Sequence, residues 1–563
     1  MLHRPDNKAR EVARRPAHQV MTLPRLGAFH QTRLSFMRVL LRRLIAENWR
    51  FEVTTFDIDA SGVGHAVYTM HGPERSYSLI AFAHDLPDDQ RSDRVIATAW
   101  DATFTLFDGL PSPSDVARLS AQVPVQEQGR VSQSELSLSR ANRSTRLWDY
   151  VLECLAAGTQ PDAQRLDEVG YLMRTTAVYG SGKFGAADRA SLEQRPEFRE
   201  PFQVEMLNVY LIRCFVVDLV EHMARARAPE RAVALAPDLR RRLGIGNSTG
   251  LGMAPFLLNH QVLINNWIAA REEALARIRT LPAAKDGDWA KLSQLAERLT
   301  ISVNAQRPDD PRQAAKLAEL RKDLQKLAAR LETRSDVARP WDNLWHWAEG
   351  VLGLEGQESL LTLLLELRPD LVDQLAVDMS ADESAMARID GRMSMSALRR
   401  LIENRYAWAL KIDWSDAAEQ ARLWYVSAAK SEPRLGDRAD ADLANFEQAL
   451  APGRDAAQLY RETEACEAEN VGQYLMERPK HRHIVRRIQI AACLPYGEIE
   501  SNTVSAQMVP IDLLRAKLSF FGATAFDPRS DRWLRINMFQ NAPFPVEWPN
   551  RDWDDWVYPQ ARA

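Results

Sequence analysis

The chain has 563 residues, of which 45% are hydrophobic and 26% are charged, and its formal net charge is −4. This length exceeds the roughly 250–300 residues at which a single core stops growing, so we expect two or three globular domains. The composition excludes a disordered or fibrous chain, and the small net charge excludes a global field that would attract nucleic acid or an anionic membrane.

The first 48 residues predict a polar, arginine-rich tail and a basic amphipathic helix. Residues 1–20 lack the apolar stretch that a secretory signal needs, and the most apolar run, Val209–Val220, is interrupted by Arg213 and Asp218 and is too short to span a bilayer. The four cysteines are far apart and form no CxxC pair. We therefore predict a cytoplasmic protein with reduced thiols, no membrane contact and no metal site.

Residues 49–122 are expected to form a small domain that contains an antiparallel β-meander. β-Branched and aromatic residues dominate Phe51–Ile58, His65–Met70 and Tyr77–Phe82, and Gly/Pro turns separate these runs. A fourth run, 96–107, has the same character, although a short apolar run of this kind could also be a helix.

The remainder is expected to be mainly helical. Residues 123–146 are rich in serine and glutamine, which is typical of a linker. From 147 to 500 nearly every periodic segment has helical spacing, which predicts a large helical body. Residues 501–563, rich in proline and tryptophan, are expected to wrap over that body as an irregular C-terminal tail. The predicted fold is thus mainly α, with a small N-terminal β-meander (α+β).

Leucines in 3-4 spacing predict a helical hairpin over 288–334. They occur on both sides of the turn Arg307–Pro311. The two helices form either an ordinary packed pair or a protruding arm through which the chain makes a homodimer.

A glycine-rich segment, 243–255, is the most informative stretch for function. A helix is expected to begin at Pro255, so the segment would place backbone N–H groups, hydroxyls and a helix dipole around a carboxylate or phosphate. The pattern matches neither GxxxxGK[ST] nor a dinucleotide fingerprint, so it implies neither ATP nor NAD. The structural alternative is a close helix–helix crossing. The candidate anion-binding residues are Gly246, Asn247, Ser248, Thr249 and Gly250.

The loop Gly244–Pro255 resembles the mobile serine-containing Gly-Ser-Ser-x-x-Met-Pro loop of the fumarase/aspartase lyases, which are also mainly helical. The Lys-x-Asn that follows proline in that family is absent here, where Phe256-Leu-Leu-Asn259 stands instead. The resemblance therefore implies a fold class only, and no site residue of that family is assigned.

A second glycine-rich segment, Tyr179–Gly185, is expected to follow a helix that ends at Val178, with Gly180 as the residue beyond the helix. Lys183 and Ser181 would bind an anion, and Tyr179 would take part in proton transfer.

A basic cluster at 478–487 and two glutamates after it form the third candidate. A solvated helix face is the usual meaning of such a cluster. Alternatively, Arg482 holds an anionic substrate while Glu498 and Glu500 transfer protons, because carboxylates on one face of a strand repel and raise one pKa. His260 is a further candidate for proton transfer.

The segment His84–Asp93 combines an imidazole with several carboxylates. It matches no calcium loop, and an acidic turn followed by a capped helix is the favoured interpretation, with a functional site as the alternative.

Together these segments favour an enzyme that binds a small carboxylate- or phosphate-bearing molecule and performs acid–base chemistry, as a lyase, hydratase or isomerase does. In one alternative the same loop binds the phosphate of a flavin or coenzyme A cofactor. In another the chain is a non-enzymatic helical scaffold, and both glycine segments serve packing. The spacing leaves open whether the segments near 180, 250 and 498 share one pocket.

Overall fold

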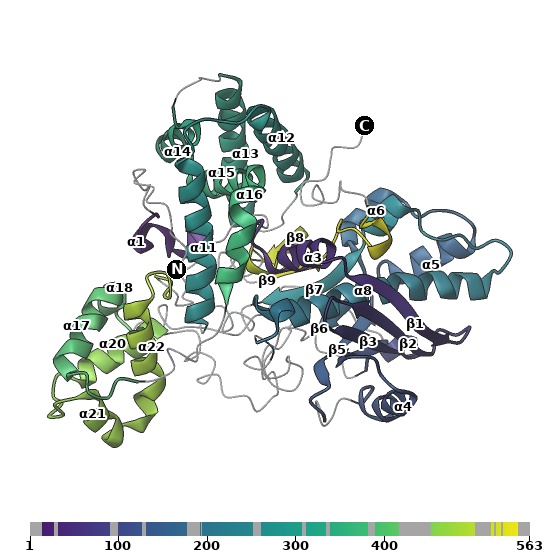
Figure 1. The fold of residues 1–563 in the computed structure, drawn as a ribbon, viewed down its shortest axis with the longest axis horizontal. Coiled ribbons are helices and arrows are strands. Elements are labelled where there is room, and N and C mark those ends of the chain that lie inside the picture. The colour runs from purple at the N-terminus through teal and green to yellow at the C-terminus, as the bar shows by residue number, and fades with distance from the viewer. Residues whose placement is uncertain are drawn as a thin grey trace.

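The computed structural model describes residues 14–26, 32–90, 99–125, 131–176, 192, 194–250, 260–306, 311–333, 338–380, 389–415, 452–500, 519–522, 525–530 and 533–549. Figure 1 shows three regions: a β-sheet with the long helix α8 lying against it, a bundle of helices from α11 to α16, and a small helical unit from α17 to α22.

The sheet has nine strands in the order β1-β2-β3-β4-β5-β6-β7-β9-β8. Strands β6 and β7 are parallel, and every other neighbouring pair is antiparallel. The strands are β1 (Arg50–Ile58), β2 (Gly64–His71), β3 (Ser76–Ala83), β4 (Ala102–Asp108), β5 (Glu135–Arg143), β6 (Tyr171–Thr176), β7 (Gly244–Gly250), β8 (Ala525–Ser530) and β9 (Trp533–Met538).

The predicted fold class is wrong, because the sheet is neither small nor confined to the N-terminal region. Strand β5 lies in the stretch expected to be a linker, β6 and β7 lie in the expected helical body, and β8 and β9 lie in the expected irregular tail. β5 alternates leucine with serine, which is a strand pattern, but its serine content is also typical of linkers. β7 has almost no apolar alternation, and its strand form depends on the two strands that pair with it.

Helix α8 (Gln203–Arg227) covers one face of the sheet and is buried over most of its length. Its Phe215 packs edge-on against Phe104 of β4, with ring centroids 5.6 Å apart. Two charged groups on α8 have partners: Arg213 donates to the carbonyl of Leu243 at 2.7 Å, and Asp218 pairs with Arg240 at 2.6 Å. The helix is therefore held to the sheet by apolar packing and by polar contacts that offset the cost of burying its charges.

Helix α4 (Pro113–Gln122) covers part of the opposite face. Ser112 caps it and forms a reciprocal capping box with Asp115, and Pro113 occupies the first turn. Leu119 packs against apolar side chains of β2, β3, β4 and β5. The other helices of this region are α3 (Phe36–Ala46), α5 (Trp148–Ala156), α6 (Ala163–Val169) and α9 (Pro237–Arg241). The short helices α1 (Ala17–Val20) and α2 (Leu23–Leu26) lie beside the bundle, where α2 contacts α15 (Figure 1).

The helical bundle contains the pair of helices that the leucine spacing indicated. Leucines of α12 and α13 are buried between these two helices and α15, so the seam faces the interior of the bundle. Its helices are α11 (Gln261–Arg279), α12 (Asp288–Ala305), α13 (Pro311–Glu332), α14 (Pro340–Val351), α15 (Leu354–Leu367) and α16 (Pro369–Val372).

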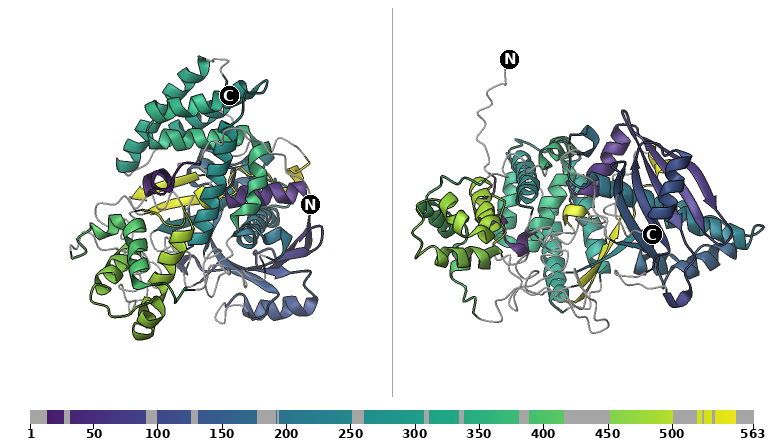
Figure 2. Two further views of the ribbon diagram at one scale, coloured as in Figure 1. Left: turned by 60° about the vertical axis from the view of Figure 1, so that its left-hand side comes forward. Right: turned by 90° about the horizontal axis from the view of Figure 1, so that it is seen from below.

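The small helical unit has its own apolar core and touches the bundle at the start of α11 (Figures 1 and 2). There the side chain of Gln261 donates to the carbonyl of Arg487 at 3.0 Å. The helices of this unit are α17 (Met395–Arg405), α18 (Ala407–Leu410), α20 (Pro452–Glu462), α21 (Val471–Glu477) and α22 (Arg482–Cys493). Within the described part of the chain, no helix combines the length and apolar character that crossing a membrane requires.

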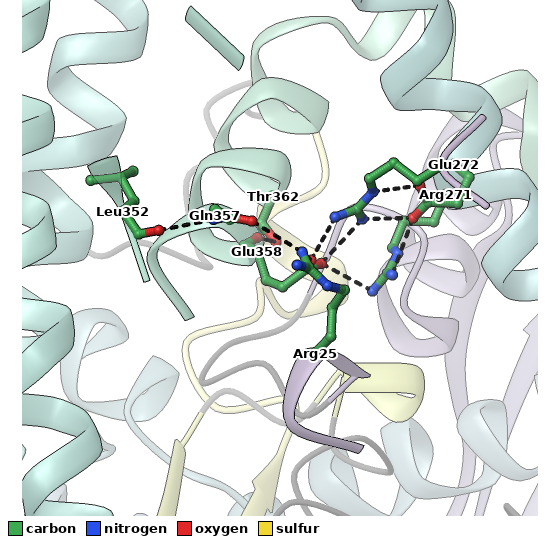
Figure 3. Close-up of polar contacts among 8 residues, drawn as sticks. Arg25, Arg271, Glu272, Leu352, Gln357, Glu358 and Thr362 are labelled. Atoms are coloured by element: carbon green, nitrogen blue, oxygen red, sulfur yellow. Dashed lines mark hydrogen bonds and ion pairs between the residues drawn. The ribbon is translucent and has the colours of Figure 1, made fainter. Parts of the chain in front are cut away.

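A group of buried charges joins the N-terminal segment to the bundle (Figure 3). Glu358 of α15 accepts from Arg15 at 2.8 Å and from Arg25 at 2.7 Å. Arg15 also donates to Glu272 of α11 at 2.7 Å, and Arg271 lies 3.2 Å from the same carboxylate. We call these three arginines and two glutamates the charged core.

Gly244 allows β7 and β9 to approach closely. A Cβ atom at this position would lie 2.5 Å from the carbonyl oxygen of Met538 and 2.9 Å from the backbone nitrogen of Gln540. Backbone atoms in a sheet cannot move aside cheaply, so we expect Gly244→Ala to lower the free energy of unfolding by about 1–3 kcal/mol. Urea denaturation measures this loss.

The matched control is Gly350→Ala, in helix α14. A Cβ there has no atom within 4 Å, so alanine should be neutral or stabilise the protein by up to about 1 kcal/mol. Equal effects of the two substitutions would contradict the close approach of β7 and β9.

Candidate functional site

The glycine-rich segment from 244 to 250 is strand β7 and not a loop at the N-terminus of a helix. Gly246 pairs with Arg174 of β6 on one side and with Asn537 of β9 on the other. The side chain of Asn247 donates to the carbonyl of Thr175 at 3.2 Å. The predicted loop is therefore corrected to a central strand. Of the remaining candidates, Ser248 lies opposite Arg535, Thr249 opposite Leu534 and Gly250 opposite Trp533.

The helix expected to end at Val178 is also corrected. Helix α6 ends at Val169, Gly170 follows it with a φ of 76°, and the chain then enters β6. Gly170, not Gly180, is thus the left-handed residue that ends this helix. The candidates Tyr179, Ser181 and Lys183 lie outside the described residues, as does the helix start expected at Pro255.

The carboxyl ends of strands β6 and β7 lie on the same side of the sheet, which we call the carboxyl edge. They are parallel, β6 ends at Thr176, and β7 ends at Gly250. In open, mainly parallel α/β sheets, ligands bind beyond the carboxyl ends of the strands. The two segments that the sequence singled out, 179–185 and 243–255, respectively come after β6 and extend beyond the end of β7. The topology therefore brings the carboxyl ends of both strands to the same side of the sheet.

Two arginines lie on one face of the sheet beside this edge. Arg140 of β5 is opposite Thr176, and Asn142 of the same strand is opposite Arg174 of β6. Residues two apart on a strand share a face, so Arg140 and Arg174 share one, and diagonal neighbours of this kind have Cα atoms about 7–8 Å apart. This face is the one opposite α8, because Arg143 and its alternate neighbours point toward that helix.

Arg140 lies over an aromatic ring. Its guanidinium carbon is 4.0 Å from the centroid of the Trp100 indole, a cation–π contact. Burial lowers the pKa of Arg140 to about 10. Arg174 is 3% exposed. A cation that is partly removed from water interacts more strongly with an anion than an exposed one does.

His84 lies on the same face. Its Nε2 is 3.2 Å from Oγ1 of Thr103, and Thr103 is directly opposite Arg140 in the β4–β5 ladder. Burial lowers the pKa of His84, although Asp101 acts in the opposite direction. Because the ordinary pKa of histidine is about 6.5, this imidazole is neutral at pH 7 and able to accept a proton.

Of the predicted proton-transfer residues, Glu498 is already engaged by an arginine and a tyrosine. Arg487 contacts both of its oxygens, at 2.7 and 2.9 Å, and Tyr406 donates to it at 2.5 Å. Burial, with the nearby carboxylate, raises the pKa of Tyr406 well above its usual value. This geometry is that of a buried ion pair joining α22 to the segment after it, and the nearest charged neighbour of Glu498 is Arg487 rather than Glu500.

The segment that carries Glu498 lies in contact with the start of α11, which follows the candidate His260. The backbone N–H of Tyr496 donates to Asn265 of α11 at 3.0 Å, so the start of α11 contacts the segment that carries Glu498. His260, half-buried, immediately precedes α11, whereas the backbone of Glu500 donates to Met21 at 2.8 Å. Arg482 is exposed at the start of α22 and does not contact Glu498.

Sequence reasoning missed Arg140, Arg174 and Trp100. The signal that could have found Arg140 is the alternation Leu136-Ser-Leu-Ser-Arg140, which has the period of a strand and assigns the arginine to one face. No comparable signal marks Trp100 or Arg174, because their proximity depends on how β4, β5 and β6 pair. Among the described residues, no group of three or more His, Cys, Asp or Glu side chains is placed to hold a metal ion.

Comparisons with known proteins found no family model, no curated protein and no solved structure that matches this chain.

Proposed function

We propose that this protein binds a small carboxylate- or phosphate-bearing molecule at the carboxyl edge of β6 and β7 and acts on it by acid–base chemistry. One observation carries the proposal: Arg140 and Arg174 lie on one face of the sheet at the edge where the two parallel strands end.

The chemistry of this face suits an anion. Guanidinium groups present paired N–H donors that match carboxylate and phosphate oxygens, and the indole of Trp100 offers a flat apolar surface beside Arg140. His84 supplies a neutral imidazole on the same face, which would take a proton from a carbon or oxygen of the bound molecule. The reaction classes that fit are those of a lyase, hydratase or isomerase.

The first test is binding. We expect Arg140→Gln to weaken the binding of small anions by about tenfold or more, because a hydrogen bond to a charged group contributes about 1.5–3 kcal/mol. The measurement is a thermal-shift and calorimetric titration with carboxylates, phosphate monoesters and the matching neutral amides.

Two controls accompany this binding test. Arg392→Gln, at an exposed position in the small helical unit, should leave affinity unchanged, and Arg140→Lys should retain part of it. If the neutral amides bind as well as the carboxylates, or if Arg140→Gln binds the anions as the natural protein does, the anion site is not at this face.

The second test separates proton transfer from binding. The exchange of a substrate C–H proton with deuterium oxide, followed by proton NMR, should be lost in His84→Gln while affinity for the anion changes by less than about twofold. Exchange that persists in this variant would remove His84 from the mechanism and leave the binding proposal intact.

We further infer that the protein works in the cytoplasm. Cys154, Cys214, Cys466 and Cys493 are all free thiols, as is usual for proteins of a reducing compartment. Cell fractionation of the tagged chain tests this inference, and recovery in an oxidising compartment would contradict it.

A further inference from the structure

The two edges of the sheet differ in how open they are to another strand. Strand β8, at one edge, contains Pro528, which has no N–H to donate and so discourages strand addition. Strand β1, at the other edge, contains no proline, and no described strand other than β2 pairs with it. Its Val53 is 40% exposed, which makes it one of few large apolar side chains at the described surface.

We propose that two copies of this chain associate through β1, pairing antiparallel so that their sheets become continuous across a two-fold axis. This inference is independent of the proposed function, because four strands lie between β1 and β6 and five between β1 and β7.

The sequence of β1 is complementary to itself in this pairing. When two antiparallel copies are aligned about the point between Val53 and Thr54, Arg50 lies opposite Asp57 of the partner subunit, and Phe51 lies opposite the partner's Phe56. The symmetry repeats both pairs, so the interface gains two pairs of opposite charge and two aromatic pairs. Cross-strand pairs of both kinds stabilise sheets.

A β-bulge makes this alignment possible. Val53 pairs with Tyr68 and Thr55 with Val67, so Thr54 is an extra residue on β1. In a regular strand, residues an odd number apart point to opposite faces. Phe51 and Phe56 are five apart, and only the extra residue brings them to the same face.

The contacts of β1 agree with these faces. Phe51 packs against Tyr68, and Phe56 packs against His222 of α8, with centroids 5.8 and 5.2 Å apart, so both rings lie on the α8 side. Asp57 lies 4.0 Å from His65 on the other side of the sheet, the side to which Arg50 also belongs by alternation.

A hollow lies on each side of β1, where side chains of an added strand would extend. The one on the α8 side has a volume of about 530 Å³ and is lined by Val53, Phe56, Asp218, His222, Arg225 and Ala226. The other has a similar volume of about 530 Å³ and lies between Thr54, Thr55 and the residues around the start of α4. Phe51 of the partner subunit, opposite Phe56, would enter the first.

The helical hairpin is a less suitable surface for self-association. Its leucine seam is buried within the bundle, and none of the large apolar side chains exposed in the described chain belongs to α12 or α13. The structure therefore favours β1 over the arm that the leucine spacing suggested.

Charge exchange tests the proposed register. We expect the natural protein to form a dimer in sedimentation equilibrium, and Arg50→Asp or Asp57→Arg to weaken it by at least about tenfold, because each creates two like-charge pairs. The double variant Arg50→Asp/Asp57→Arg should restore the dimer, since the opposite charges then face each other again. Arg392→Asp, on the small helical unit, is the matched control and should have no effect.

Three results would contradict the proposed dimer or its register. A protein that is monomeric at every concentration overturns the proposal, and so does a dimer that neither single reversal weakens. Single reversals that weaken a dimer that the double variant does not restore overturn this register. Both side chains are exposed, so circular dichroism should show every variant folded; if one single variant is unfolded, the other tests the same pair.

Discussion

Replacing Glu358 by glutamine is expected to lower the free energy of unfolding by about 3–5 kcal/mol, the usual cost of removing one partner from a buried ion pair. Its side chain is 3% exposed and accepts from Arg15 and Arg25, with Arg271 within 3.6 Å (Figure 3). Without this carboxylate, Arg15 and Arg271 would share Glu272, and Arg25 would keep its hydrogen bond to the amide of Gln357. Urea and thermal unfolding, monitored by far-ultraviolet circular dichroism, measure the loss.

Two neighbouring glutamates of α11 provide a matched comparison. The side chain of Glu272 is fully buried and bonds to Arg15, whereas that of Glu273 is 26% exposed and pairs with Arg14 and Arg277. Glu272→Gln should therefore destabilise the protein about as much as Glu358→Gln does. Glu273→Gln should cost no more than about 1 kcal/mol, because exposed pairs contribute little. Similar losses for Glu272→Gln and Glu273→Gln would show that the charged core is not buried in solution.

Acid should lower the free energy of unfolding by protonating Glu358. Burial alone would raise the pKa of Glu358, but Arg15 and Arg271 outweigh it and hold the pKa at about 2. A depressed carboxyl pKa contributes stability that is fully present above the unfolded pKa of about 4.3 and is lost as pH falls toward the folded value. The stability contributed by Glu358, of the order of 3 kcal/mol, should therefore disappear between about pH 5 and pH 2.

The comparison that isolates this effect is the difference in unfolding free energy between the natural protein and Glu358→Gln as a function of pH. The difference should be constant from pH 7 to about pH 5 and shrink toward pH 2, because a protonated glutamate resembles glutamine. A difference that stays constant down to pH 2 would mean that Glu358 does not titrate with a depressed pKa.

The local sequence pattern was sufficient to predict an element wherever that element buries one regular row of apolar side chains. The β-branched runs near 51–58, 65–70 and 77–82 are strands β1, β2 and β3, and the leucines at 3-4 spacing lie on α12 and α13. In these segments the period of the apolar residues matches the period of the structure, and each neighbour in space is also near in sequence.

The local sequence pattern did not predict strands whose hydrogen-bonding partners are distant in the sequence. The chain from 244 to 250 has five polar or glycine residues in succession and resembles a loop, yet it lies between β6 and β9, the latter almost 300 residues further along the chain. The hydrogen bonds of a central strand are made to both neighbours, so its own side chains need not carry the signal.

The candidate site divides in the same way. Glycine-rich composition singled out residues 179–185 and 243–255, because it is a local property of the sequence. Composition did not show that β6 and β7 are parallel neighbours, or that Arg140 and Arg174 lie beside the carboxyl end of β6. It also did not show that Glu498, which was predicted to transfer protons, forms an ion pair with Arg487.

By itself, the sequence determined the globular and largely helical character of the chain, its first three strands and its leucine-rich helices, because these depend on composition and on contacts within a few turns. Only the tertiary structure decided the nine-stranded sheet, the parallel ends of β6 and β7, the charged core and the position of β1 as the outermost described strand. The physical reason is that strand pairing and ion pairing join residues that can lie hundreds of positions apart. The free energy that favours one partner over another depends on both segments together, so neither segment reveals it alone.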